Sequence, residues 1–153
     1  MKSRTHQQRS YKLLPATLED VPWLNDLRRE AYRELFNLTW GAWDEQRHRR
    51  HFAESISQGG IEIITVDGRG VGMLQLVVGA DAIEVAEIQI LPVEQSLGVG
   101  SAVLHDVIRA ARRCRVPVRL STGRKNERAR SLYERLGFRV TATTDTHFHL
   151  EID

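Results

Sequence analysis

The stretch ILPVEQSLGVGSAVL, residues 90–104, constrains the fold more than any other part of the chain. It begins as an apolar strand, passes through a proline and two spaced glycines, and continues as an apolar helix. Glycine lets a backbone approach a ligand closely, and the first N–H groups of a helix have no partner inside that helix. A strand, a glycine-rich turn and a helix start in this order are typical of a phosphate site.

Two familiar phosphate-binding patterns do not fit this stretch. The P-loop requires Gly-Lys-Ser/Thr at a fixed distance, and no such triplet follows here. The dinucleotide-binding loop requires three glycines, whereas Gly98 and Gly100 are followed by Ser101 and Val103. A Gly-x-Gly alone is equally typical of a tight turn at the start of a helix, so the wider pattern has to decide.

Periodicity predicts the other elements. Helices with one apolar face are expected from Thr17 to about Phe36, over Asp44 to Ser57, through a long segment that buries Val103, Val107, Ala110 and Cys114, and over 126–137. Strands are expected at 11–16, 61–66, 71–78, 83–91, 116–121, 138–143 and 147–152. The short turns favour antiparallel neighbours, so the order β-α-α-β-β-β-α-β-α-β-β predicts an α+β fold on a mixed sheet. Residues 1–10 are expected to form a flexible tail and residues 11–153 a single domain.

Composition excludes several classes of protein. The net charge of +2 without a clustered basic face argues against nucleic-acid binding. Cys114 is the single cysteine, which excludes an internal disulfide and a thiolate zinc cluster. The first ten residues lack the apolar core of a signal peptide, and no apolar run reaches the roughly 18–20 residues that span a bilayer. A cytoplasmic protein that binds neither nucleic acid nor membrane is expected.

Two motifs resemble those of the GNAT N-acetyltransferase superfamily. Residues 95–100, QSLGVG, match Gln/Arg-x-x-Gly-x-Gly/Ala, with which the family cradles the pyrophosphate of acetyl-coenzyme A. NERARSLYERLGF, residues 126–138, resembles the family's Asn-x-x-Ala…Tyr-x-x-x-Gly-Phe signature. The resemblance covers nearly the whole chain after residue 10 and implies a mostly antiparallel sheet of about seven strands flanked by four helices. WGAWDE, AEIQILP and TDTH more narrowly resemble small bacterial GNAT proteins of unassigned substrate.

The resemblance also implies how acetyl-coenzyme A is held. In the family the strand before the glycine turn splays from the next parallel strand, and the pantetheine arm pairs with its exposed backbone. The residues implied to bind the coenzyme are Ile88, Gln89, Ile90, Gln95, Ser96, Leu97, Gly98, Val99, Gly100, Ser101, Asn126 and Ala129. The basic residues Arg124, Lys125 and Arg128 either screen the ribose phosphate or form a solvated patch.

Tyr133 and Glu87 are the expected catalytic residues. Tyr133 lies seven residues after Asn126, where family tyrosines protonate the coenzyme sulfur; the alternative is a core tyrosine. Glu84 and Glu87 share a strand and, being an odd number of residues apart, are expected on opposite faces. Glu87 is favoured as the base, because its apolar sequence neighbours would desolvate a carboxylate and make it more basic. Glu84 is the second candidate for the base, and either glutamate can instead be an exposed strand residue without a catalytic role.

Three further groups of residues carry weaker signals. His48 with His51, and His147 with His149, have spacings that suit a metal, but no carboxylate or thiolate cluster accompanies them, so no metal is predicted. Trp40 and Trp43 lie between the first two helices, in a loop that forms part of the acceptor pocket in GNAT proteins. They are expected either to line that pocket or to cap the core.

The resemblance implies an N-acetyltransferase that moves an acetyl group directly from acetyl-coenzyme A to a primary amine of a small molecule or peptide. The alternative is a non-catalytic acyl-coenzyme A-binding regulatory module with the same fold. The intact tyrosine and glycines favour the enzyme. The expected partners are the amine substrate and, in a homodimer, a second copy of the chain.

Overall fold

The computed structural model describes residues 10–39 and 44–153, with residues 32–39 described by their backbone alone. It confirms the predicted order of elements and the α+β class. The strands are β1 (Lys12–Pro15), β2 (Ile61–Val66), β3 (Arg69–Val78), β4 (Ile83–Ile90), β5 (Val118–Gly123), β6 (Arg139–Thr143) and β7 (His147–Ile152). The helices are α1 (Val21–Thr39), α2 (Glu45–Gln58), α3 (Val99–Arg113) and α4 (Glu127–Leu136), with 3-10 turns η1 (Leu18–Asp20) and η2 (Pro92–Glu94).

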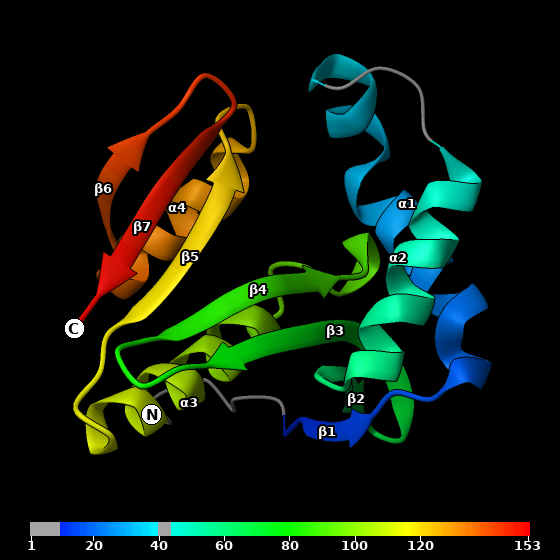
Figure 1. Cartoon of the computed structure of the whole chain (residues 1–153), viewed down its shortest axis with the longest axis horizontal. Helices are drawn as coiled ribbons and strands as arrows, with labels where there is room; N and C mark the ends of the chain where they lie inside the picture. The colour runs from blue at the N-terminus through cyan, green and yellow to red at the C-terminus, as the bar shows by residue number, and fades with distance from the viewer. Residues whose placement is uncertain (1–9, 40–43) are drawn as a thin grey trace, which may run out of the picture.

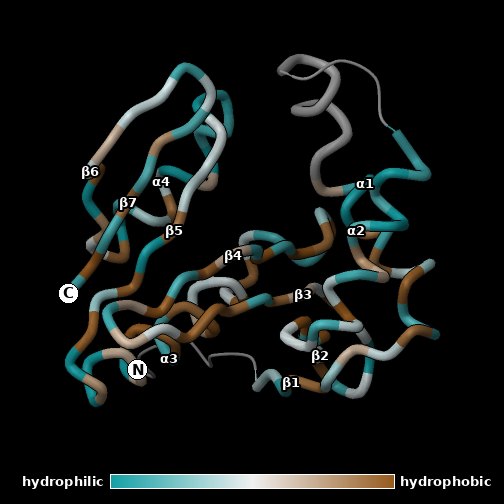
Figure 2. Tube along the Cα trace, in the orientation of Figure 1, coloured by the Kyte–Doolittle hydropathy of each residue, from teal (hydrophilic) through white to brown (hydrophobic). Residues whose placement is uncertain are grey.

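The strands form one seven-stranded sheet in the order β1-β2-β3-β4-β5-β7-β6. The β4–β5 pair is parallel and the other pairs are antiparallel. α3 and α4 cover one face of the sheet, while α1 and α2 cover the other face over β2, β3 and β4 (Figure 1). Hydrophobic stretches run along α3 and into the strands beside it, whereas the turn between β6 and β7 is hydrophilic (Figure 2).

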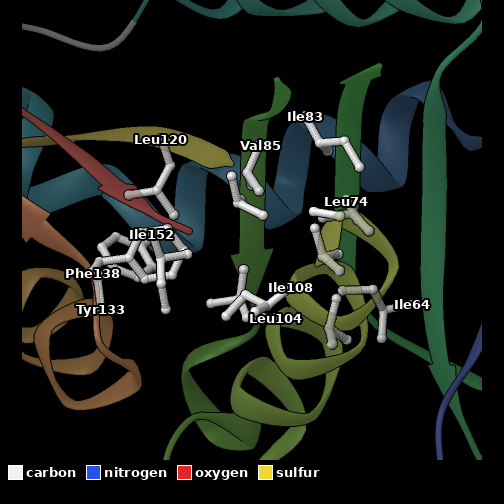
Figure 3. Close-up of a cluster of buried hydrophobic side chains, with 14 of the residues drawn as sticks. Ile64, Leu74, Ile83, Val85, Leu104, Ile108, Leu120, Tyr133, Phe138 and Ile152 are labelled. Atoms are coloured by element: carbon white, nitrogen blue, oxygen red, sulfur yellow. The ribbon is translucent and has the colours of Figure 1, made fainter. Parts of the chain in front are cut away.

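The larger core lies between the sheet and α3, where Leu104 and Ile108 point from the helix toward the strands (Figure 3). The smaller core joins Leu24 and Leu27 of α1 and Phe52 of α2 to the opposite face of the sheet. The expected burial of Cys114 is wrong. α3 ends at Arg113, and Cys114 is its exposed C-cap residue, because the apolar period continues in the sequence past the last turn of the helix.

β4 contains a bulge at the place where its apolar and polar residues cease to alternate, at Val85 and Ala86. Gln75 of β3 pairs with Glu87, but its neighbour Leu76 pairs with Val85, so Ala86 is an additional residue on β4. A bulge of this kind reverses the alternation of side chains along a strand.

The bulge corrects the expected facing of the two glutamates. Val85 before it and Ile88 after it both pack against the larger core, although they are three residues apart. Glu84 and Glu87 therefore point to the same face of the sheet, the one covered by α1 and α2.

β4 and β5 separate at the bulge. Their parallel pairing joins Ile83–Val85 to Val118–Leu120 and extends no further along β4, while β5 continues to pair with β7 up to Gly123. Figure 1 shows the two strands diverging from this point. The backbone of β4 after Val85 therefore faces a gap, as the resemblance implied.

Gly72 of β3 fits tightly against the diverging part of β4. A Cβ atom at Gly72 would lie 2.3 Å from the backbone oxygen of Gln89 and 2.9 Å from Cδ1 of Ile90. A backbone oxygen in a sheet has little freedom to move. β4 can therefore lie this close to β3 only because Gly72 has no side chain.

We expect Gly72→Ala to lower the free energy of unfolding by about 1–3 kcal/mol, the usual cost of overpacking a well-packed interior. Urea denaturation measures this change. Gly79→Ala is the matched control, because its Cβ would lie 3.4 Å from the nearest atom, the oxygen of Ala82. Equal stability of the two variants would contradict the tight fit at Gly72.

Candidate active site

A cavity of about 1050 Å³ lies between the end of β4, the glycine turn and α4. Ten of the twelve residues implied to bind the coenzyme line it: Ile88, Gln89, Ile90, Gln95, Ser96, Gly98, Gly100, Ser101, Asn126 and Ala129. The remaining two point elsewhere. Leu97 is 46% exposed, and Val99 is buried in the larger core.

The glycine turn presents free backbone donors to this cavity. Gly98 is the N-cap of α3 with φ +91°, and Ser96 also has a left-handed backbone with φ +67°. The N–H of Ala102 donates to the oxygen of Gly98 at 3.0 Å, which is the first backbone hydrogen bond of α3. The N–H groups of residues 99–101 come before it and therefore have no acceptor within the helix. Three such donors at a helix start suit a pyrophosphate.

Gln95 stabilises the glycine turn through its side chain, and its backbone N–H is not available to a ligand. That N–H already donates to the oxygens of Leu91 and Pro92, at 3.1 and 3.2 Å, which removes it from the donors expected to hold a phosphate. The side-chain Nε2 donates to the oxygen of Ile90 at 2.9 Å. This bond ties the turn to the end of β4.

One ion pair and one hydrogen bond from arginine side chains hold the same turn. Buried Glu94 forms an ion pair with Arg69 at the start of β3. Arg128 of α4 lines the cavity and donates to the hydroxyl of Ser96. Arg124 instead lies over the ring of Phe148, 5.6 Å from its centroid. Of the three basic residues considered for the ribose phosphate, Arg128 is therefore the one that lines the larger cavity.

A second, smaller cavity of about 180 Å³ lies on the other side of β4, next to α1 and β5. Arg28, Glu87 and His147 line it. Four residues line both cavities: Ile88, Gln89, Asn126 and Tyr133. Their position marks the junction at which groups bound in the two cavities would meet.

Tyr133 is buried at this junction, with 7% of its surface exposed, and packs edge-on against Phe138 with the ring centroids 5.9 Å apart. Burial raises the pKa of its phenol to about 12, so Tyr133 is a protonated donor at neutral pH. Asn126 is the N-cap of α4, and its Oδ1 accepts from the N–H of Ala129 at 3.2 Å. Because the cap uses the oxygen, the amide NH₂ is the part of Asn126 that can bind a ligand.

Polar groups surround the carboxylate of Glu87, whereas the sequence had favoured apolar surroundings. Its Oε1 lies 3.3 Å from an Arg28 guanidinium nitrogen and 3.0 Å from Nε2 of His51. Its Oε2 accepts from Nε2 of Gln89 at 2.9 Å. The carboxylate is 16% exposed and is held in place by three donors. Glu84, in contrast, is exposed and lines neither cavity.

Comparisons with known proteins identify the family of the chain. The sequence pattern of the acetyltransferase (GNAT) family matches residues 24–138. The chain belongs to this family. An uncharacterized N-acetyltransferase of Mycobacterium bovis is 33% identical over 96 residues, 60% of this chain and 62% of that protein. A protein of the same description in Mycobacterium tuberculosis matches over the same shares of both chains.

Solved structures of two acetyltransferases share the fold. The PaiA N-acetyltransferase of Thermoplasma acidophilum, in complex with coenzyme A, superposes with a TM-score of 0.72 at 20% identity, over 93% of this chain and 98% of that one. An acetyltransferase of Thermus thermophilus gives a TM-score of 0.77 at 17% identity, over 94% and 96% of the two chains.

Sequence reasoning missed Arg28 and His51, whose side chains contact Glu87 in the candidate site. Arg28 follows Leu24 by four residues, so it lies on the apolar face of α1, where a charge is unusual. A charged residue on this apolar face was therefore a signal that Arg28 is functional or forms an ion pair. His51 was considered only as half of a metal pair, and its contact with Glu87 joins segments 36 residues apart in the chain.

The remaining histidines of the two pairs considered for a metal, His48, His147 and His149, are buried or have protein contacts. His48 is buried on α2, and burial, followed by the charges of Arg28 and His51, lowers its pKa to about 4. Nδ1 of His149 lies 2.7 Å from the hydroxyl of Ser121. Among the described residues no three potential metal ligands gather, and none of the described helices is long and apolar enough to cross a membrane. Trp40 and Trp43 lie outside the described residues.

We expect Gly100→Glu to abolish measurable coenzyme A binding while the protein remains folded. A Cβ at Gly100 meets only Ile90 and Leu132, at 3.8 and 3.9 Å, so the fold accepts a side chain, but a carboxylate there would repel a pyrophosphate. Calorimetric titration measures the affinity, with Gly100→Ala as the uncharged control. Unchanged affinity in folded Gly100→Glu would show that the pyrophosphate lies elsewhere.

Proposed function

We propose that this protein is an acyltransferase that moves an acetyl group from acetyl-coenzyme A directly to a primary amine of a small molecule or peptide. The observation that carries the proposal is the meeting of two cavities at Tyr133. One is bounded by a glycine turn with free N–H groups, and the other contains Glu87. Direct transfer requires two substrates to meet at one point, and this arrangement supplies it.

The residues present fit coenzyme A. The large cavity follows the unpaired edge of β4, reaches the start of α3 and contains Arg128 as a cation. An extended pantetheine arm can add to a strand edge as a peptide does. Bound there, acetyl-coenzyme A supplies an activated acyl group. The known complex of the PaiA N-acetyltransferase with coenzyme A supports the same assignment.

Tyr133 would act on the leaving thiolate. With a pKa of about 12, its phenol holds a proton more tightly than an ordinary thiol, whose pKa is about 8.5. It therefore stabilises the developing thiolate first by donating a hydrogen bond. The desolvation that raises the pKa of Tyr133 would also raise the pKa of a thiol beside it. The difference between the two pKa values would then be smaller, which favours proton transfer from the phenol to the thiolate.

Glu87 would take the proton of the amine. An alkylammonium has a pKa of about 10.4, so at neutral pH the acceptor must lose a proton before it attacks. Glu87 lines the smaller cavity with an ionisable oxygen, and three donors fix its position. It would accept the proton through a water molecule, while Tyr133 acts on the opposite side of the thioester.

A panel of amines assayed for release of free coenzyme thiol tests the proposed function. We expect at least one primary amine to accelerate thiol release over hydrolysis. A protein that binds acetyl-coenzyme A but releases thiol with none of these acceptors would instead be the non-catalytic regulatory module.

We expect Tyr133→Phe to lower turnover by roughly 10- to 1000-fold with little change in coenzyme affinity. The substitution keeps the ring against Phe138 and removes only the hydroxyl. Steady-state kinetics and calorimetric titration separate the two quantities. Turnover equal to that of the wild type would make Tyr133 a core residue without a chemical role.

We expect Glu87→Gln to lower turnover at neutral pH and to recover part of it as the pH rises, because more of the acceptor is then already neutral. Glu84→Gln is the matched control: it carries the same change on the same face of β4 but outside both cavities. The measurement is a pair of pH–rate profiles with one acceptor of known pKa. Loss of the acidic limb in the Glu84 variant alone would assign the base to Glu84.

A further inference from the structure

Gln89 combines a polar side chain with an almost fully buried position. It is 4% exposed, lies between Ile88 and Ile90 on β4, and lines both cavities at their junction. Its Nε2 donates to Oε2 of Glu87 at 2.9 Å. Its Oε1 is buried and accepts no hydrogen bond within the described residues.

Chemistry fixes the orientation of this amide. The reversed orientation would place the amide oxygen of Gln89 against the carboxylate oxygen of Glu87, and two acceptors repel one another. The NH₂ group therefore faces Glu87, and the oxygen is the atom left over. An unpaired buried acceptor costs about 1–3 kcal/mol, and nearly all buried polar groups in folded proteins are paired. A ligand with an N–H donor at the junction would supply the missing partner.

We propose that Oε1 of Gln89 accepts a hydrogen bond from the amine of the acceptor and thereby holds its nitrogen beside Glu87 at the junction. This inference rests on the proposed function and identifies a residue that selects the substrate class. When an ammonium group has given one proton toward Glu87, a primary amine keeps two N–H bonds. One binds Gln89, and the other remains directed at Glu87 while the lone pair faces the thioester.

A secondary amine cannot satisfy both groups. After losing a proton it keeps a single N–H, so either Gln89 or Glu87 is left without its donor. A site built to hydrogen-bond a substrate N–H discriminates strongly against an analogue that lacks it. Gln89 therefore favours primary over N-methylated amines, beyond any steric effect of the methyl group.

The pantetheine arm also carries N–H groups, and the experiment separates this second source. Gln89→Met removes the amide at nearly constant size. We expect its KM for a primary amine to rise roughly 10- to 100-fold, its KM for the N-methyl analogue to change less than about threefold, and its coenzyme Kd to stay within about twofold. If the wild type does not turn over the N-methyl amine, its inhibition constant replaces its KM.

Gln75→Met is the matched control, because Gln75 pairs with Glu87 across the sheet but lines neither cavity. It should leave all three quantities unchanged. If Gln89→Met does not fold, Gln89→Asn withdraws the oxygen by one methylene, and we expect the same loss of discrimination.

Two outcomes would overturn the inference alone, with thiol release by the wild type intact. Equal changes for both amines would mean that Gln89 only supports Glu87. A weakened coenzyme Kd with an unchanged amine KM would assign the hydrogen bond to pantetheine. Absence of thiol release by the wild type with every amine would overturn the proposed function itself, and this inference with it.

Discussion

The site depends on the point at which β4 leaves β5. Parallel pairing ends at Val85, and Ala86 is the additional residue of a bulge at that place. The divergence leaves one edge of β4 unpaired, and the bulge reverses the side-chain alternation, so that Ile88 still faces the larger core while Glu87 faces α1 and α2. Gly72 permits this path by leaving room for the backbone of Gln89. One irregularity therefore opens the gap that the proposed function assigns to the coenzyme, and it orients the polar groups beside that gap.

The contacts of Glu87 link the chemistry to the packing of the two N-terminal helices. Arg28 comes from α1, His51 from α2 and Gln89 from the strand itself, so the carboxylate joins three elements. Arg28 also lies 5.7 Å from the ring centroid of Phe52, in the smaller core. A carboxylate that is already paired attracts an incoming ammonium less strongly than a free one would. Under the proposed function, amine binding at Glu87 therefore competes with Arg28, and an additional acceptor such as Gln89 is useful there.

Local signals made most of the fold predictable. Asp44 and Asn126 cap their helices through side-chain oxygens, and Gly98 and Gly137 adopt the left-handed conformations expected at a helix start and a helix end. The bulge did leave a local signal that the sequence analysis missed: IEVAEIQI alternates apolar and polar residues except at Val85 and Ala86, where two apolar residues are adjacent, and the additional residue of the bulge is Ala86. The pairing of Glu87 with Arg28 and His51 was not predictable, because these two residues come from segments distant in sequence. Contiguous motifs predicted most of the lining of the larger cavity, whereas the smaller cavity is assembled from separate elements.

Under the proposed function, the volume of the smaller cavity limits the substrate selectivity that it can provide. At about 180 Å³ it is smaller than the roughly 300–1000 Å³ typical of sites that enclose a whole ligand. It therefore has room for the reacting amine and its nearest atoms, and the rest of an acceptor must lie outside. The adjoining face of β5 and β7, which no described helix covers, carries the Ser121–His149 contact and the Arg119–Glu151 ion pair. If the proposals hold, Glu87 and Gln89 select the class of amine, while recognition of a small molecule or a peptide depends on surfaces beyond them.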